Sequence, residues 1–485
     1  MHSSTPHSSP MTSSPAQQLL DASLANFQQP IAQLPTEILL AIFEYCSYWD
    51  TDEDDPSDFL VWTSVLHVCR HWYWAGVSYP MLWQIVCSDA SEAYLRAILR
   101  RSQDLPVSIY ILSNFTPRCA RLLLKEAHRI RYLHVEIEFS SMSKMTDIIR
   151  HTRGIPRLEY LKLYIINDGD GVASGVKLNE LFPFSLPSLH RLDVITSCDI
   201  SRILDAPNLE TLSLESMFSE LDGFDAAFFE LVPFLSALQK MPRLSNLTLS
   251  HMRPWYGPGV DMDNIEPTLL PNVYGLTLQG PAYAYTWLCE HLLVPVTASI
   301  GLELYVGADS EVDMVISSLV RLFSGNPRTP RVLRSVVLAS TPRGLTVEGT
   351  SSRDDLLEPT TLSSDSTRPE FWLYCKPVKV RDSRERPVSL EGLSALLEAL
   401  PLSDMRALNI VGYKARNNLV PRSLRGTYFD GVPTDTGRVF QHFLRSDVVS
   451  DRANLTSGSE KGWKQMFPNL QVLSWDPRSS CNASS

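Results

Sequence analysis

The stretch from Leu34 to Trp83 decides how the chain begins to fold. It opens Leu34-Pro35-Thr36-Glu37-Ile38-Leu39-Leu40-Ala41-Ile42-Phe43 and closes Val68-Cys69-Arg70-His71-Trp72, followed by Pro80-Met81-Leu82-Trp83. Helical spacing of apolar residues predicts an amphipathic helix whose single broad stripe is made of Ile38, Leu39, Ile42, Phe43 and Cys46. Pro35 suits the first helical position, and Glu37 suits the first turn because the helix dipole favours negative charge there.

The later half of this stretch predicts a second helix, with one face made of Val61, Val65, Val68, Cys69, Trp72 and Ala75. A helical hairpin of about 50 residues buries too little surface to be a stable domain alone. We therefore expect its surplus apolar side chains to pack against the following domain or against a separate protein.

Four clusters in this stretch carry a resemblance to a known family. Leu-Pro-x-Glu-Ile-Leu at 34–39, Ile42-Phe43, Val-Cys-Arg-x-Trp at 68–72 and Pro-x-Leu-Trp at 80–83 stand in the order typical of an F-box, which the stretch resembles. In that family the hairpin binds the Skp-type adaptor of cullin-based ubiquitin ligases. The resemblance implies an adaptor contact made by Leu34, Pro35, Ile38, Leu39, Ile42, Phe43, Val68, Cys69, Arg70 and Trp72.

One feature departs from the family pattern. The connection from Asp50 to Asp58 is longer and more acidic than the usual one. Such a run is typical of a solvated loop, although it would weaken docking if it crossed the adaptor surface.

Composition excludes several classes of protein. The chain has 485 residues, 44% of them hydrophobic, and a formal net charge of −11, so no basic footprint predicts binding to nucleic acid or to an anionic membrane. Eight cysteines lie far apart without a CxxC pair, which indicates reduced thiols in an intracellular protein. With no signal peptide and no apolar run of bilayer length, we expect a cytoplasmic or nuclear protein without membrane contact.

A repeated unit follows the first hundred residues. Its fullest form, Pro-x-Leu-x-x-Leu-x-Leu, begins at Pro156, Pro187, Pro207, Pro242 and Pro271, and a version without proline begins at Ile130. The unit recurs roughly every 29 residues, at the long edge of the range for leucine-rich repeats. Helical stretches such as 118–127 and 224–239 lie between copies. We predict an α/β fold, an irregular leucine-rich-repeat-like solenoid with parallel strands and helices outside.

The predicted domain organisation follows from these patterns. It comprises a disordered or loosely helical leader (1–29), the F-box module (30–88), the repeat domain (89–478) and a tail (479–485). After about residue 285 the pattern weakens, with further strands near 300–304, 333–338, 371–374, 405–410 and 468–475 and insertions at 342–368 and 412–462. This weaker half leaves a different α/β arrangement open.

Signatures of enzymes and cofactor sites are missing from the sequence. Asn167–Gly171 lacks the spacing of a calcium loop, and His67 and His71 form an i, i+4 pair without a third ligand. We therefore expect no catalytic residues, no metal site and no cofactor. Arg253, Trp255 and Tyr256 lie in a Pro/Gly-rich segment after a predicted strand, and these residue types dominate protein–protein hot spots. They are candidate target-binding residues, with packing against the chain itself as the alternative.

The favoured function is a substrate-recognition subunit of an SCF-type ubiquitin ligase. It would bind the Skp adaptor, and through it a cullin, with the F-box, and an unidentified target protein with the repeats. The alternative is a non-catalytic repeat scaffold whose hairpin only caps the solenoid. An enzyme on an α/β fold is a third class. A cap would bury the Ile38/Ile42 face internally, whereas an F-box leaves it accessible.

Overall fold

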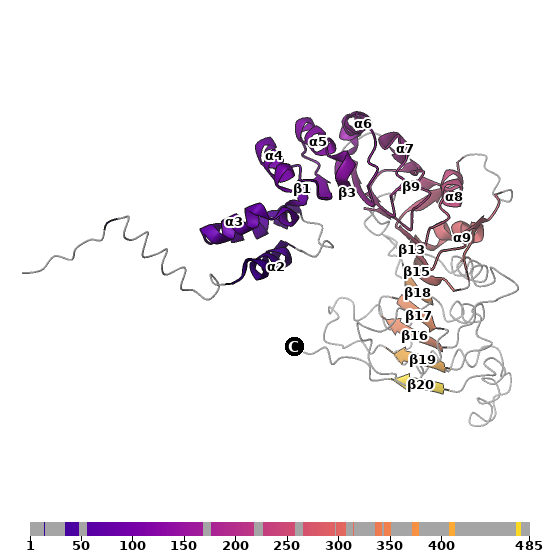
Figure 1. The fold of residues 1–485 in the computed structure, drawn as a ribbon. Helices are drawn as coiled ribbons and strands as arrows, with labels where there is room; N and C mark the ends of the chain where they lie inside the picture. The colour runs from indigo at the N-terminus through magenta and orange to yellow at the C-terminus, as the bar shows by residue number, and fades with distance from the viewer. Residues whose placement is uncertain are drawn as a thin grey trace, which may run out of the picture. The chain divides into compact units, whose positions relative to one another are not determined.

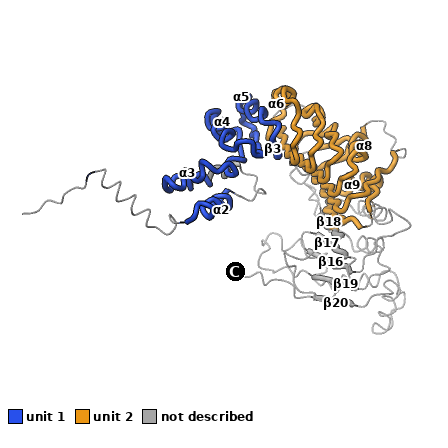
Figure 2. The backbone as a smooth tube through the Cα atoms, in the orientation of Figure 1, with its two compact units in different colours: residues 1–134 blue, residues 135–485 orange. Residues whose placement is uncertain are grey.

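The chain divides into two compact units in the computed structural model, residues 1–134 and residues 135–485 (Figure 1, Figure 2). The structure describes residues 14, 34–47, 56–167, 176–217, 227–257, 265–295, 297–306, 314, 335–341, 344–350, 371–377, 407–412 and 472–476. The predicted leader apart from residue 14, the predicted 412–462 insertion apart from its first residue, and the tail lie outside the described residues.

Unit 1 begins with a helical module. It consists of α2 (Thr36–Ser47), a 3-10 helix η2 (Pro56–His67), α3 (Arg70–Ser78) and a 3-10 turn η3 (Pro80–Trp83). Glu37 lies in the first turn of α2 as predicted, although the helix begins one residue after Pro35.

The prediction of one continuous second helix is wrong. The chain leaves η2 at His67, and Cys69 adopts an extended backbone (φ −159°) before α3 begins at Arg70. A 3-10 helix turns once every three residues instead of every 3.6. The apolar residues predicted to share one α-helical face therefore do not stay on one face along η2. Val68 is consequently 54% exposed, while Trp72 is buried.

The rest of unit 1 alternates strands and helices. β1 (Ile85–Cys87) pairs in parallel with β2 (Val107–Ile111), and β3 (Ile130–Glu138), which contains the boundary between the units, follows in the strand order. Between them lie α4 (Glu92–Arg101) and α5 (Pro117–Leu124), the second of which overlaps the predicted helical stretch at 118–127. The Ser91 hydroxyl accepts a hydrogen bond from the Tyr94 backbone amide, and the Thr116 hydroxyl accepts one from the Cys119 backbone amide. Both helices therefore begin with side-chain caps.

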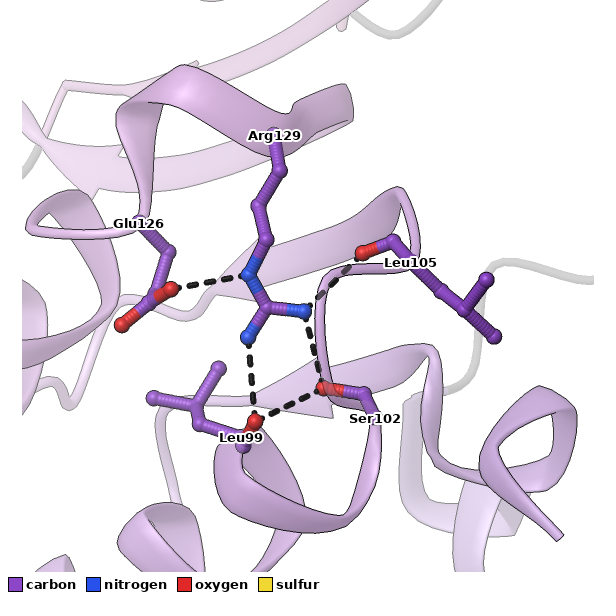
Figure 3. A network of polar contacts seen from close by, with 5 residues as sticks. All are labelled: Leu99, Ser102, Leu105, Glu126 and Arg129. Carbon is purple, nitrogen blue, oxygen red and sulfur yellow. Dashed lines mark hydrogen bonds and ion pairs between the residues drawn. The ribbon is translucent and has the colours of Figure 1, made fainter.

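A buried arginine closes the C-terminal end of α4 (Figure 3). The Arg129 side chain is 3% exposed, and its Nε lies 2.8 Å from a Glu126 carboxylate oxygen. Its other nitrogens donate to the Leu99 and Leu105 carbonyls at 3.1 and 2.9 Å and to the Ser102 hydroxyl at 2.9 Å. A cation at a helix C-terminus satisfies carbonyls that lack intrahelical partners and favourably meets the helix dipole.

Unit 2 is organised around parallel strands. The order β4 (Tyr160–Ile166), β6 (Arg191–Thr196), β8 (Thr211–Ser216), β10 (Asn246–Ser250), β13 (Gly275–Pro281) and β15 (Ser299–Val306) follows the chain. The second leucine of each repeat stands opposite the next across the sheet, and all are buried: Leu161, Leu192, Leu212, Leu247 and Leu276. The predicted period-2 pattern therefore places one apolar row in the core.

The turn before each of these strands is repeated too. The first apolar residue of each unit donates its amide to the carbonyl three residues earlier, at Leu158, Leu189, Leu209, Leu244 and Val273. The residue after the proline joins neighbouring repeats: Ser188 donates to the Pro156 carbonyl, Asn208 to that of Pro187 and Asn272 to that of Pro242, at 2.7–2.8 Å. The sequence pattern thus marks a hydrogen-bonded turn as well as a strand.

Helices and a smaller sheet return the chain between these strands. The helices are α6 (Met142–Arg150), α7 (Leu178–Leu181), α8 (Leu231–Gln239) and α9 (Ala282–His291). A second parallel sheet has the order β11 (Arg253–Trp255), β9 (Phe228–Glu230), β7 (Ile200–Arg202) and β5 (Val176–Lys177), and β12 (Thr268–Leu269) pairs with β14 (Leu292–Leu293). α9 packs against β11 and β13.

Beyond β15 the strands no longer follow the order of the chain. β15 pairs with β18 (Phe371–Pro377), followed by β17 (Gly344–Thr350), β16 (Ser335–Thr341), β19 (Ala407–Gly412) and β20 (Val472–Asp476). β17 is antiparallel to both its neighbours. The predicted insertion at 342–368 therefore contains a strand at 344–350 that the sequence reasoning did not identify, because Leu345-Thr346-Val347 alternates within a polar segment.

The described chain is a mixed α/β protein of helices and largely parallel strands with a helical N-terminal module, and its described strands form no closed barrel. None of the described helices is both long and apolar enough to cross a bilayer.

Candidate functional site

Helix α2 carries apolar side chains on two faces. Leu39 and Phe43 are fully buried, whereas Ile38 and Ile42, one position earlier in each pair, are 50% and 39% exposed. Tyr45 continues the exposed row and is 84% exposed. Since residues 38, 42 and 45 follow helical i, i+4, i+7 spacing, they form one exposed stripe along α2.

The buried face of α2 is held by aromatic packing and a close backbone approach. The Phe43 and Trp72 rings meet edge-to-face at 5.3 Å between centroids. Gly76 of α3 lies so close that a Cβ there would be 2.4 Å from a Leu66 methyl group and 3.6 Å from the Phe43 ring. This contact locks α2 and α3 together, so Leu39 and Phe43 serve the module's own core.

A second aromatic pair fixes the end of the module. Trp62 and Trp83 meet edge-to-face at 5.1 Å, and the Trp83 indole N–H donates to the Gly76 carbonyl at 3.0 Å. The Arg101 guanidinium lies 4.4 Å from the Trp83 ring centroid, a cation–π contact. Trp83 is 2% exposed, so these contacts lie in the core of the module.

A polar contact ties α2 to the end of α3. The Tyr79 hydroxyl donates to the Glu44 carboxylate. This hydrogen bond is the main cause of a raised pKa at Tyr79, helped by burial and by the charge of Glu44. The orientation of the exposed stripe on α2 is thus fixed at both ends of the helix pair.

The structure divides the ten predicted adaptor-contact residues by accessibility. Exposed residues are Pro35, Ile38, Ile42, Val68 and Arg70, partly exposed ones are Leu34 and Cys69, and buried ones are Leu39, Phe43 and Trp72. The exposed members lie on the surface of the helical module, where a partner can reach them. The three buried ones act through the fold that presents the others.

Four further apolar residues on the module are exposed: Tyr45, Tyr73, Trp74 and Met81, with Trp74 at 66%. Tyr73 and Trp74 meet edge-to-face at 5.3 Å. Tyr45 was detectable from the sequence, because it stands three residues after Ile42 on the same face. Trp74 was not, since its accessibility depends on where α3 begins.

The second candidate cluster lies on unit 2. Arg253–Trp255 is a short strand, β11, and not part of a loop, because it pairs with β9 in the smaller sheet. The Arg253 guanidinium lies 5.1 Å from the Phe228 ring centroid, and Tyr256 packs against Trp287 with centroids 6.2 Å apart. Trp255 is 48% exposed. Packing against the chain itself thus accounts for part of this cluster, while Trp255 remains accessible.

The described titratable groups do not gather into a metal-binding cluster: no three His, Cys, Asp or Glu residues lie together in that part of the chain. Burial raises the pKa of the Cys87 thiol and of the Cys289 thiol to about 12. Both remain protonated at neutral pH and are poor nucleophiles.

Comparison with known proteins locates one family domain in this chain. The family model described as F-box-like matches residues 31–89, which include α2, η2, α3 and η3. No curated protein matches the chain.

Proposed function

Because residues 31–89 form an F-box-like domain, we propose that the chain is the substrate-recognition subunit of an SCF-type, cullin-based ubiquitin ligase. The helical module binds a Skp-type adaptor, which connects it to the cullin, and unit 2 binds the target protein. The chain itself performs no chemistry. It raises the effective concentration of the target near the ubiquitin-charged enzyme, in the cytoplasm or nucleus.

The exposed stripe on α2 carries this proposal. Ile38, Ile42 and Tyr45 are accessible in the folded chain, although burial of a large aliphatic side chain is worth roughly 1.5–3 kcal/mol. Half-exposed side chains recover about half of that when a partner covers them. A hairpin that only capped the repeats would bury this face against its own chain, so the exposure supports an adaptor over a cap.

The repeats of unit 2 support the role of target receptor. The aligned leucines, the recurring turn and the hydrogen bonds to proline carbonyls from one repeat to the next are what a leucine-rich-repeat-like solenoid requires. Such stacks expose a broad surface formed by many strands, which suits recognition of a protein. We assign the repeat character to β4–β15, where strand order follows chain order.

A double substitution tests the adaptor role. Ile38→Asp with Ile42→Asp places two carboxylates in the proposed interface, and we expect capture of a purified Skp-type adaptor to fall at least roughly 100-fold. The thermal melting curve should stay unchanged, because both side chains are already exposed in the free chain.

The matched control is Val232→Asp with Leu269→Asp. These apolar residues are 44% and 63% exposed on unit 2, so the substitutions add the same charge outside the module's own sequence. Capture should survive in the control. If the Ile38/Ile42 variant retains wild-type capture, the adaptor role is wrong and the capping scaffold becomes the better account.

A further inference from the structure

Helix α9 presents an aromatic and acidic face. Tyr283, Trp287 and Glu290 follow one another at i, i+4 and i+7, so they lie on the same side of the helix. Tyr283 and Trp287 are 38% and 36% exposed, and Glu290 is partly exposed. The opposite side of α9 is buried, with Tyr285 and Leu288 in the core.

Tyr256, from the segment after β11, completes this face. Its ring meets the Trp287 ring edge-to-face at 6.2 Å. Burial is the main cause of a raised pKa at Tyr256, and the nearby charges of Glu290 and Tyr283 raise that pKa further. The Tyr256–Trp287 ring contact and the i, i+4, i+7 spacing on α9 make Tyr256, Tyr283, Trp287 and Glu290 neighbours, and we call them the α9 patch.

The α9 patch has an uncompensated charge. Within the part of the chain that the structure describes, Glu290 forms no ion pair with a lysine or arginine. The neighbouring cation on β11, Arg253, lies over Phe228. The faces of aromatic rings carry negative electrostatic potential. The rings of the α9 patch therefore add to the negative potential of the Glu290 carboxylate. The complement of this surface is a cation.

We propose that the α9 patch binds a basic side chain of the target protein, with arginine preferred over lysine. The inference rests on the proposed function, because it names the chemistry that unit 2 recognises in its target. A guanidinium stacks on tyrosine and tryptophan faces and donates two parallel hydrogen bonds to a carboxylate, whereas a lysine ammonium offers only a point charge. The net charge of −11 favours approach of a basic segment.

The probe is a set of fluorescein-labelled dodecapeptides with randomised flanks and a fixed central residue: arginine, lysine, citrulline or glutamate. Citrulline has the shape of arginine without its charge. Fluorescence polarisation with the full-length protein should rank affinity as arginine, then lysine, then citrulline, with glutamate weakest. The preference for arginine over citrulline should be roughly tenfold.

Two variants locate the binding site. Glu290→Gln should remove most of the preference for arginine over citrulline, and Trp287→Ala should weaken binding of the arginine and lysine peptides roughly tenfold. The matched controls are Glu266→Gln, at an exposed glutamate, and Tyr274→Ala, at a tyrosine 60% exposed outside the α9 patch. Both controls should keep wild-type ranking and affinity.

Equal affinity for the arginine and citrulline peptides would overturn the proposal, because it would mean that the α9 patch binds an apolar ligand. An unchanged preference in Glu290→Gln, or absence of binding to every peptide in the set, would overturn it too. Adaptor capture is measured on the same preparations. If the wild-type protein captures the adaptor but shows no peptide selectivity, only the α9 patch proposal is rejected. If the wild-type protein fails to capture the adaptor, the proposed function is rejected.

Discussion

At the scale of single residues, α2 illustrates how neighbouring apolar side chains take different roles. The sequence presents Ile38, Leu39, Ile42 and Phe43 as one stripe, yet Leu39 and Phe43 are buried in the module while Ile38 and Ile42 are exposed. The split depends on Gly76, whose missing side chain lets α3 approach Leu66 and Phe43. A residue on a different helix therefore decides which half of the stripe is offered to a partner.

Gly76→Ala is expected to destabilise the helical module by roughly 1–3 kcal/mol, although alanine is the better helix former. The added methyl group would stand 2.4 Å from a Leu66 methyl group in a close-packed core. Chemical denaturation followed by tryptophan fluorescence measures the loss.

Leu66→Ala removes the clashing group and supplies the control for this prediction. The double variant should lose less stability than the sum of the two single variants, because the two positions share one space. Additive losses would show that Gly76 is not a steric contact.

At the scale of elements, helix ends and turns contribute as much as apolar faces. Both α4 and α5 begin with a hydroxyl cap, and the C-terminal end of α4 is closed by Arg129. In unit 2 the residue after the repeat proline bonds to the previous repeat, so Asn208 and Asn272 act as inter-repeat contacts. Each such contact is worth about 1 kcal/mol, and they occur where leucines already stack.

Two arginine–glutamate pairs in unit 1 allow a matched comparison. Arg129 pairs with Glu126 at 2.8 Å with its side chain 3% exposed, and Arg96 pairs with Glu92 at 2.6 Å with its side chain 60% exposed. Arg129→Ala should cost roughly 3–5 kcal/mol because it strands buried polar groups, whereas Arg96→Ala should cost less than about 1 kcal/mol.

Denaturation curves of both variants measure this difference. Arg129→Lys keeps the charge without the planar guanidinium that reaches four acceptors, and it should recover only part of the loss. Equal costs for Arg129→Ala and Arg96→Ala would mean that the network in Figure 3 adds nothing beyond a surface ion pair.

At the scale of the whole molecule, the reactivity of the described cysteines measures which of them are accessible to solvent. Cys46 and Cys69 on the helical module are partly exposed, whereas Cys87 and Cys289 are buried with a thiol pKa of about 12. An ordinary thiol pKa is near 9, so folding keeps these two protonated and their contribution to stability is present below pH 9. That contribution is lost as the pH rises from about 9 towards 12, because only the unfolded chain ionises there.

Alkylation with iodoacetamide at pH 8, read by peptide mass spectrometry, should modify Cys46 and Cys69 at least roughly 100-fold faster than Cys87 and Cys289. A bound Skp-type adaptor should protect Cys69, a predicted contact residue, and leave the buried pair unchanged. Denaturant, as the control, should make all four react alike. An unprotected Cys69 in a saturated complex would place the adaptor elsewhere.

Local pattern in the sequence was enough for the helical N-terminal module, the F-box resemblance, and the main-sheet strands β3, β4, β6, β8, β10, β13 and β15. It did not predict the smaller sheet, since β9 (Phe228–Glu230) lies within the stretch predicted as a helix at 224–239. Helical and period-2 spacing, prolines before strands and capping residues all act over a few neighbours, so one chain segment contains the information. The same reasoning located the later strands near 335, 371, 407 and 472, although not β17.

Only the tertiary structure decided which side chains face solvent and how distant segments pair. The break at Cys69, the exposure of Ile38 and Trp74, the β15–β18 pairing and the contact of Tyr256 with Trp287 all depend on partners that are remote in the chain. The physical reason is that burial is a property of the space between elements. Periodicity states that a face is apolar, and packing alone determines whether the chain or a partner covers it.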